Sequence, residues 1–207
     1  MTAALVEHDT APDRRSWDLL LQAWRELDVP EGWHAEIDEG QIVLVPPPHR
    51  HHHGIAAMLH RALYGVISED LEVYQTLGVH IAPLDKLYVP DLVLAPRETV
   101  DAADPDTNDP LDAAEALFVV EITSQSNAKD DRTKKLWAYA HAPVPVYLLV
   151  DRFDEHGPTA TLFTGPQNGA YKHAERVPFG EPLKLPAPFA AVVDTAGFPG
   201  RACGSAP

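Results

Sequence analysis

The chain has 207 residues, a formal net charge of −15, and apolar and charged fractions of 45% and 23%, which indicate one globular domain and exclude a disordered chain. The acidic balance argues against broad electrostatic adhesion to nucleic acid or to an anionic membrane. No apolar run approaches the roughly 20 residues that span a bilayer, and the single Cys203 provides neither a disulfide framework nor a cysteine metal site. By default we expect a cytoplasmic protein.

We expect residues 1–14 to form a flexible N-terminal tail, residues 15–195 one domain, and residues 196–207 a flexible C-terminal tail. The first helix is predicted to begin after Ser16, interpreted as its N-cap. Its apolar face has helical spacing and comprises Trp17, Leu20, Leu21, Trp24 and Leu27. A β-hairpin is predicted next, with arms 34–37 and 41–45 around a turn at 38–40.

Residues 49–69 predict a second helix. Its apolar face comprises Ile55, Met58, Leu59, Ala62, Leu63 and Val66. Residues 71–83 alternate enough to form one or two strands, and residues 87–95 predict another. Residues 97–115 predict an acidic loop that no core would accept.

The most informative stretch runs from residue 88 to residue 151. Two apolar runs, YVPDLVLAP and ALFVVEITS, each carry one acid, Asp91 and Glu121. A helix over 127–142 and a strand over 144–151 follow, and this order indicates α/β or α+β with a mixed sheet. Beyond it we expect a second hairpin turning at Gly165–Gly169, and then one short strand or helix.

An ionised carboxylate in an apolar run needs a cation, a set of hydrogen bonds or an exit to solvent. Two strand-borne acids suit Mg²⁺, which prefers oxygen ligands and is usually held by one or two carboxylates while it keeps several waters. The backbone carbonyl of Ile122 is available to complete such a site. In the structural alternative, Asp91 caps a strand end and Glu121 pairs with Lys134 or Lys135. Spacing alone does not separate the two interpretations.

Lys135 lies on the helix that follows Glu121. A cation aimed at a metal–carboxylate site can orient water and stabilise charge on a phosphate. Lys134 points about 100° away around a helix, so we expect one of the two lysines to face the site. Asp131, four residues earlier, is placed to hold Lys135. A solvated lysine on a helix face is the alternative.

Glu36, in the first hairpin arm, gains interest only from these neighbours. The histidines of HRHHH (49–53) invite a zinc interpretation, but adjacent histidines on a helix point in different directions, and no H-E-x-x-H is present. We favour a polar helix start from which one histidine reaches the site. Phosphate-loop and G-x-S-x-G signatures are absent from the sequence.

Taken together, DEGQIVLVPPP, the histidine-led helix, VPDLVLAP and VVEITSQSNAKDDRTKKLWAYAHAPVPVYLLVD resemble the Uma2 family of restriction-type endonucleases within the PD-(D/E)XK nuclease superfamily. The resemblance covers about residues 16–190 and is most specific over residues 121–151. It implies a restriction-endonuclease-like core, in which helices flank a mixed β-sheet, together with an N-terminal helix and β-hairpin.

By this resemblance, Pro90-Asp91 matches the PD element and Glu121 the central acid, and these two acids with the Ile122 carbonyl would hold Mg²⁺ or Mn²⁺. Thr123 stands where the superfamily places lysine. Lys135 on the following helix matches that function, and Asp131 is the accompanying acid.

The remaining matches are Glu36, as a further catalytic acid, and His52 or His53, as the histidine opening the next helix. Ser124 matches the serine of E-x-x-S, and Gln125 departs from the proline often found after it.

The implied activity is metal-dependent endonucleolytic hydrolysis of nucleic acid, with DNA expected. It would be performed by a homodimer, since cutting both strands usually takes two sites. Two other functions stay open. One is a catalytically inactive nuclease-fold binding or scaffold protein, which the acidic charge favours. The other is a metal-dependent hydrolase of a small phosphorylated substrate.

Overall fold

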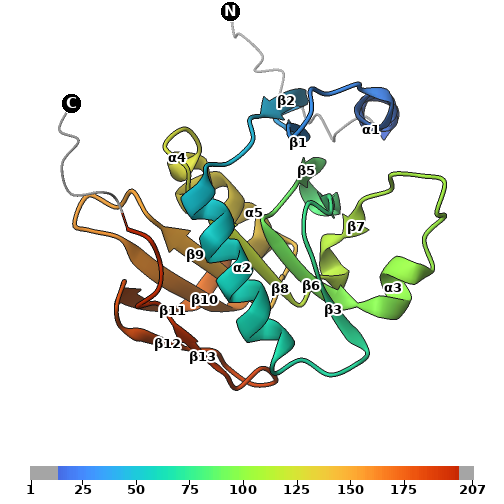
Figure 1. The fold of residues 1–207 in the computed structure, drawn as a ribbon. Helices are drawn as coiled ribbons and strands as arrows, with labels where there is room; N and C mark the ends of the chain where they lie inside the picture. Colours follow the sequence, from blue (N-terminus) through green and yellow to red (C-terminus); the bar gives the residue numbers. More distant parts are fainter. Residues whose placement is uncertain (1–13, 201–207) are drawn as a thin grey trace, which may run out of the picture.

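The computed structural model describes residues 14–200, so most of the predicted N-terminal tail and Cys203 lie outside the described residues (Figure 1). The helical elements are α1 (Arg14–Glu26), α2 (Arg50–Tyr64), 3₁₀ turn η1 (Ala82–Leu84), α3 (Arg97–Asp101), 3₁₀ turn η2 (Ala113–Glu115), α4 (Ala128–Asp130), π-helical turn η3 (Asp131–Lys135) and α5 (Leu136–His141). The first eight strands are β1 (His34–Asp38), β2 (Gln41–Val45), β3 (Leu71–Tyr74), β4 (Val79–Ile81), β5 (Lys86–Tyr88), β6 (Leu92–Pro96), β7 (Leu111–Asp112) and β8 (Phe118–Ile122). The last five are β9 (Val146–Asp151), β10 (Thr159–Gln167), β11 (Ala170–Pro178), β12 (Pro182–Lys184) and β13 (Val192–Asp194).

The main sheet has six strands in the order β11-β10-β9-β8-β6-β3. The pair β8–β9 is parallel, and the other neighbouring pairs are antiparallel. A second sheet has the order β2-β1-β5-β4-β7, and β12 pairs with β13. The predicted mixed sheet flanked by helices, with an N-terminal helix and hairpin, is therefore confirmed. Among residues 14–200, no helix combines the length and apolar character needed to cross a membrane.

Side chains of the central strands alternate between two cores, as the two-residue period of a strand requires. In β8, Phe118, Val120 and Ile122 pack in the core that contains buried residues of α2. Val119 packs in the core that contains buried residues of α5. The strand is buried on both faces, and by this alternation Glu121 lies on the α5 face.

Helix α1 is amphipathic and covers the hairpin β1–β2, where Trp24 donates its indole N–H to the carbonyl of Ala35 at 2.7 Å. The helix begins at Arg14, so the prediction that Ser16 is its N-cap is wrong. Leu27, predicted on the apolar face, lies beyond the helix end and is exposed. Helix α2 likewise ends at Tyr64, earlier than predicted, and leaves Val66 exposed.

The single strand predicted over 87–95 is two strands that belong to different sheets. Pro90 has no N–H to give to a ladder, and the chain leaves the small sheet after β5 and enters the main sheet at β6. Asp91 follows this break directly, and its N–H donates to the carbonyl of Val120. The proline therefore sets the acid at the start of a central strand.

Two further predictions need correction, and one is confirmed. The acidic loop 97–115 contains β7 and two helical turns, and Leu111 and Ala113 are buried in the core. The predicted second hairpin is confirmed: it turns at Asn168-Gly169, within the predicted Gly165–Gly169, and both turn residues have positive φ. After that hairpin the chain forms two strands, β12 and β13, and Phe198, predicted in the C-terminal tail, is buried.

The helix predicted over 127–142 is present but irregular, because η3 inserts a π turn between α4 and α5. Such turns are frequent at functional sites. This one carries Asp131, Lys134 and Lys135.

Candidate active site

Glu121 and Asp91 lie on neighbouring central strands of the main sheet. The antiparallel register pairs Leu92 with Val120, so the next position along each strand sets Asp91 opposite Glu121. The carboxylate of Asp91 accepts the N–H of Ile122 through Oδ2 at 2.7 Å. The sheet register thus brings the two predicted acids to the same edge.

Lys135 is the hub of a buried acid cluster. Its Nζ donates to Oε1 of Glu36 at 2.8 Å and to Oε1 of Glu121 at 3.1 Å. It also lies 3.8 Å from Oδ1 of Asp131, the predicted i,i+4 contact. Only 5% of Lys135 is exposed. The structure therefore brings together the lysine and three of the four acids singled out in the sequence.

In this cluster three carboxyl groups surround a single ammonium group. Both carboxylate oxygens of Asp131 are buried without a hydrogen-bond partner, and burial raises the pKa of this group to about 7 despite Lys135. Burial also raises the pKa of Glu121 well above its ordinary value, against the opposing effect of Lys135. Burial alone would lower the pKa of Lys135, but Glu121 and Glu36 outweigh it, and the ammonium stays charged.

Two tyrosines position the cluster and were not predicted from the sequence. The hydroxyl of Tyr139 donates to Oε1 of Glu121 at 2.9 Å, and the ring of Tyr88 lies 5.2 Å from Nζ of Lys135, within cation–π range. Tyr139 lies four residues after Lys135, on the same helix face, and this spacing is a sequence signal by which it can be found.

The β1–β2 hairpin contacts the site through Asp38, the last residue of β1 before the turn. Asp38 is bonded by Lys86, Tyr88 and Lys134. Burial alone would raise the pKa of Asp38, but the two lysines outweigh it and hold it below its ordinary value. In β1, Glu36 accepts the N–H of Val89 at 3.0 Å. Lys134 therefore bonds Asp38 beside the hairpin turn, whereas Lys135 bonds the acids of the cluster. This division is expected, because the two lysines point in different directions around the helix.

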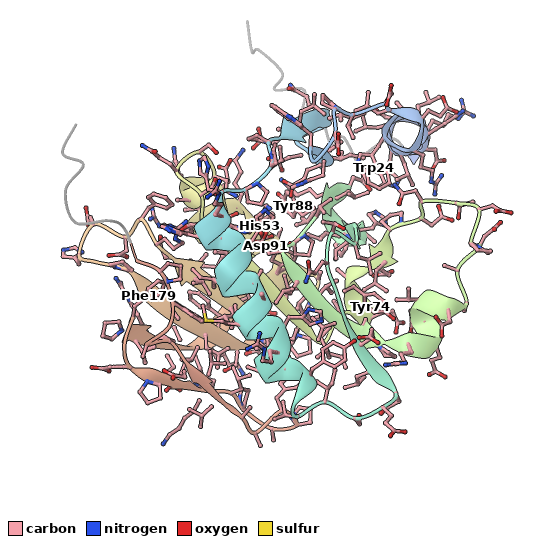
Figure 2. The ribbon with its side chains drawn as sticks, viewed as in Figure 1. Trp24, His53, Tyr74, Tyr88, Asp91 and Phe179 are labelled. Carbon is pink, nitrogen blue, oxygen red and sulfur yellow. The ribbon has the colours of Figure 1, made fainter. Side chains whose placement is uncertain are left out.

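Asp91 has a histidine partner from α2. Oδ1 of Asp91 lies 3.0 Å from Nε2 of His52, and Nδ1 of His52 is buried without a hydrogen-bond partner. His53 is exposed and contacts the ring of His52 edge-on. Figure 2 shows His53 and Asp91 near the N-terminal end of α2. Of the two predicted histidines, His52 is therefore the one that reaches an acid.

A cavity of about 350 Å³ opens over these groups. Asp91, Glu121, Lys135, His52 and His34 line it, together with residues 45–49 and 124–127. His34 was not predicted; burial lowers its pKa, although Glu36 opposes this.

Ser124, a predicted supporting residue, lines the cavity and shapes the start of the following helix. Its hydroxyl donates to Oδ1 of Asn127 at 2.7 Å, and the backbone N–H of Asn127 donates back to the Ser124 hydroxyl oxygen at 3.3 Å. Thr123, where the superfamily places lysine, is fully buried and bonds to Asp151 and Arg152.

The donor set fits a hard divalent cation. Within residues 14–200, no three His, Cys, Asp or Glu side chains come together as a metal-binding group. Two carboxylates, Asp91 and Glu121, face one cavity, and Mg²⁺ is usually held by one or two carboxylates and waters. Three buried carboxyl groups surround one ammonium, and a cation at this place would favour the ionised forms of Glu121 and Asp131, whose pKa values burial raises.

The structural alternative also accounts for part of these contacts. Asp91 does accept a backbone N–H, and Glu121 does pair with Lys135. It does not account for Glu36 and Asp131, which add buried acids that Lys135 alone cannot neutralise.

A mixed sheet flanked by helices is the restriction-endonuclease-like core that the resemblance implies. The profile of the Uma2 family, described as "Putative restriction endonuclease", matches residues 20–196. The chain belongs to the Uma2 family.

A solved structure supports the same fold. It is a crystal structure of "a putative nuclease belonging to DUF820" from Anabaena variabilis ATCC 29413, with a TM-score of 0.64, 19% identity, and coverage of 84% of this chain and 90% of that one. No protein with curated function matches the chain in sequence.

Proposed function

We propose that this protein is an endonuclease that hydrolyses phosphodiester bonds of nucleic acid, with DNA as its substrate and Mg²⁺ or Mn²⁺ as its cofactor. The observation that carries the proposal is the convergence of Asp91, Glu121 and Lys135 on one cavity, in a member of a family described as restriction endonucleases. Divalent metal use is general among restriction-endonuclease-like families.

Asp91 and Glu121 would hold the metal, with the carbonyl of Ile122 as a third oxygen. A bound metal of this kind polarises a phosphate and lowers the pKa of a coordinated water. Holding it requires that His52 release Oδ1 of Asp91 or share it, because the two are 3.0 Å apart in this structure.

The remaining groups act through charge and position. The ammonium of Lys135 would stabilise negative charge that builds on the phosphate or orient the attacking water. Glu36 holds that ammonium at 2.8 Å, and Tyr139 fixes the Glu121 carboxylate by a 2.9 Å hydrogen bond. Asp131, one helical turn before Lys135, lies 3.8 Å from the same ammonium and adds to its positioning.

A binding or scaffold protein remains the second candidate, and the charge of −15 is the observation that favours it. A scaffold gains nothing from three buried acids around one lysine, whose desolvation costs several kcal/mol per charge. A hydrolase of small phosphorylated molecules would use the same cavity. Homodimerisation and a cytoplasmic location stay predictions.

The test combines metal binding with cleavage. Isothermal calorimetry with Mg²⁺ and Mn²⁺ would be done on wild type and on Glu121→Gln, followed by a plasmid-nicking assay with both proteins. We expect binding and nicking in the wild type and the loss of both in the variant. Wild type that binds neither metal would make Asp91 and Glu121 structural acids and would favour the scaffold.

A further inference from the structure

The reactive groups lie at the bottom of the cavity, below the protein surface. Two acids line the cavity: the side chain of Glu121 is 3% exposed and that of Asp91, the more accessible, is 22% exposed. The phosphates of a double helix lie on the outside of a stiff rod. A recessed acid meets such a phosphate where the protein surface wraps around the rod, or where the strand leaves the rod and enters the protein.

Two stretches of chain contribute most of the residues that line the cavity. Residues 45–49, which include three successive prolines, connect β2 to α2 and form one wall. Residues 124–127 form another wall, tied by the Ser124–Asn127 hydrogen bonds. Prolines fix their own φ, so the first wall has little freedom to swing aside for a wide substrate. The cavity volume of about 350 Å³ lies near the lower end of the range for small-ligand pockets.

The rim of this cavity is basic, although the protein as a whole is acidic. The first turn of α2 exposes Arg50, His51 and His53 beside the cavity residue His49. Lys129 is exposed two residues after the cavity residue Asn127, with one exposed acid, Asp130, next to it. The start of α2 and α4 lie at the same end of the molecule (Figure 1).

Neighbouring contacts extend this basic rim. A guanidinium nitrogen of Arg152 is 3.4 Å from Nδ1 of His51. His49 has no side-chain hydrogen bond to the backbone N–H groups that open α2. The carbonyl of His49 accepts the N–H groups of His52 and His53, so the N–H groups that favour an anion are the two before them, those of Arg50 and His51. The rim therefore offers two exposed cations, Arg50 and Lys129, against one exposed acid, Asp130, and these cations can pair with a phosphate backbone.

We propose that this site takes single-stranded nucleic acid, whose backbone enters between residues 45–49 and 124–127 and is held by the basic rim. This inference rests on the proposed function and names its substrate class. A single strand is flexible enough to enter a recess, and its bases are free to stack on aromatic and imidazole planes. The exposed rings of His51 and His53 provide such planes on the rim.

The first experiment compares three substrates of one sequence with wild-type protein and Mg²⁺ or Mn²⁺. They are a labelled single-stranded DNA, its perfect duplex, and a duplex with a central unpaired bubble. We expect cleavage of the single strand, and of the bubble within its unpaired region, at rates about tenfold or more above the duplex, the factor for opening one base-pair step.

The outcomes separate the two proposals. A duplex cut as fast as the single strand overturns the substrate class and leaves the endonuclease standing. Wild type that cuts none of the three with either metal contradicts the endonuclease itself. Cleavage of all three that persists in Asp91→Asn identifies a contaminating nuclease and removes the support for both.

The second experiment tests the rim without cleavage, by fluorescence anisotropy of the single strand in the presence of EDTA. Arg50→Glu and Lys129→Glu should each weaken binding about tenfold and lower the slope of log K against log salt by about 0.7 for each phosphate that the variant no longer neutralises. Lys184→Glu is the matched control, because this exposed lysine lies in β12, at the opposite end of the molecule from the start of α2 (Figure 1). Equal losses in all three variants would show a general charge effect and overturn the assignment of the rim.

Discussion

Nζ of Lys135 lies 2.8 Å from Oε1 of Glu36, a residue 99 positions earlier in the chain. The contact joins the helix after β8 to the hairpin of the second sheet, and both residues are buried. The same ammonium bonds Glu121 of the main sheet. One lysine thus ties the acids of both sheets into a single site, and its loss is expected to affect stability and activity together.

Lys135→Met should lower the free energy of unfolding at pH 7 by about 3 kcal/mol, because breaking a buried ion pair leaves uncompensated charge. The variant should also lose cleavage activity. Urea denaturation followed by circular dichroism measures the first effect. Lys134→Met is the matched control: its side chain is 41% exposed, and exposed pairs contribute only about 0–1 kcal/mol. Equal destabilisation by the two variants would contradict the buried hub.

Tyr139→Phe removes one hydroxyl and keeps the ring. We expect a loss of about 1.5–3 kcal/mol of unfolding free energy, the range for a hydrogen bond to a charged group. We also expect weaker metal binding, because Glu121 loses its 2.9 Å partner. Tyr147→Phe is the control, since that hydroxyl donates to the backbone carbonyl of Asp131 at 2.9 Å. It should cost stability with little change in metal affinity. Calorimetry that shows the same affinity for both variants would make Tyr139 purely structural.

The sequence predicted the central part of the site because that part follows short-range rules. The two acids stand out because each interrupts a short apolar run, and the period of a helix places Asp131 beside Lys135. The register that sets Asp91 opposite Glu121 is a contact between strands, which no local pattern contains. The expected contact of Asp131 with Lys135 agrees with the geometry, although the catalytic roles of these residues stay proposals. Glu36 carried no signal of its own and entered through the family resemblance.

Other features depend on contacts that no local pattern contains. The π turn adds one residue to a helical turn, and such an addition is invisible in the periodicity of a helix this short. Leu111, inside an acidic loop, is buried because its strand pairs with β4, about 30 residues away. The local pattern predicts Pro90 within one strand, whereas this proline separates strands of two sheets. For Leu111 and Pro90, the pairing of strands overrides the local pattern.

Asp131→Asn should change how stability depends on pH. Burial raises the pKa of Asp131 to about 7 in the folded protein, above the ordinary aspartate value of about 3.9. Between these values the folded state holds a proton that the unfolded state has released, so this group makes the protein less stable as pH rises from about 4 to about 7. The variant lacks this group and should gain stability relative to wild type over that window.

Urea midpoints of both proteins between pH 4 and pH 8 measure this difference. Asp130→Asn is the control, because Asp130 is exposed on the adjacent position and its variant should follow the wild-type curve. A stability difference between Asp131→Asn and wild type that stays constant across the window would show that Asp131 is ionised throughout.

Metal binding should stabilise the folded wild type and fail to stabilise Asp91→Asn. A ligand that binds only the folded state adds RT ln(1 + [L]/Kd) to its stability, about 2.7 kcal/mol at a hundredfold excess over Kd. Thermal unfolding with increasing Mg²⁺ or Mn²⁺ should therefore raise the Tm of wild type, and EDTA should reverse the rise. Asp112→Asn is the matched control: Asp112 is an exposed acid whose carboxylate caps η2, and its variant should respond to metal as wild type does. A Tm rise of equal size in Asp91→Asn would place the metal elsewhere on this acidic protein and remove Asp91 from the proposed site.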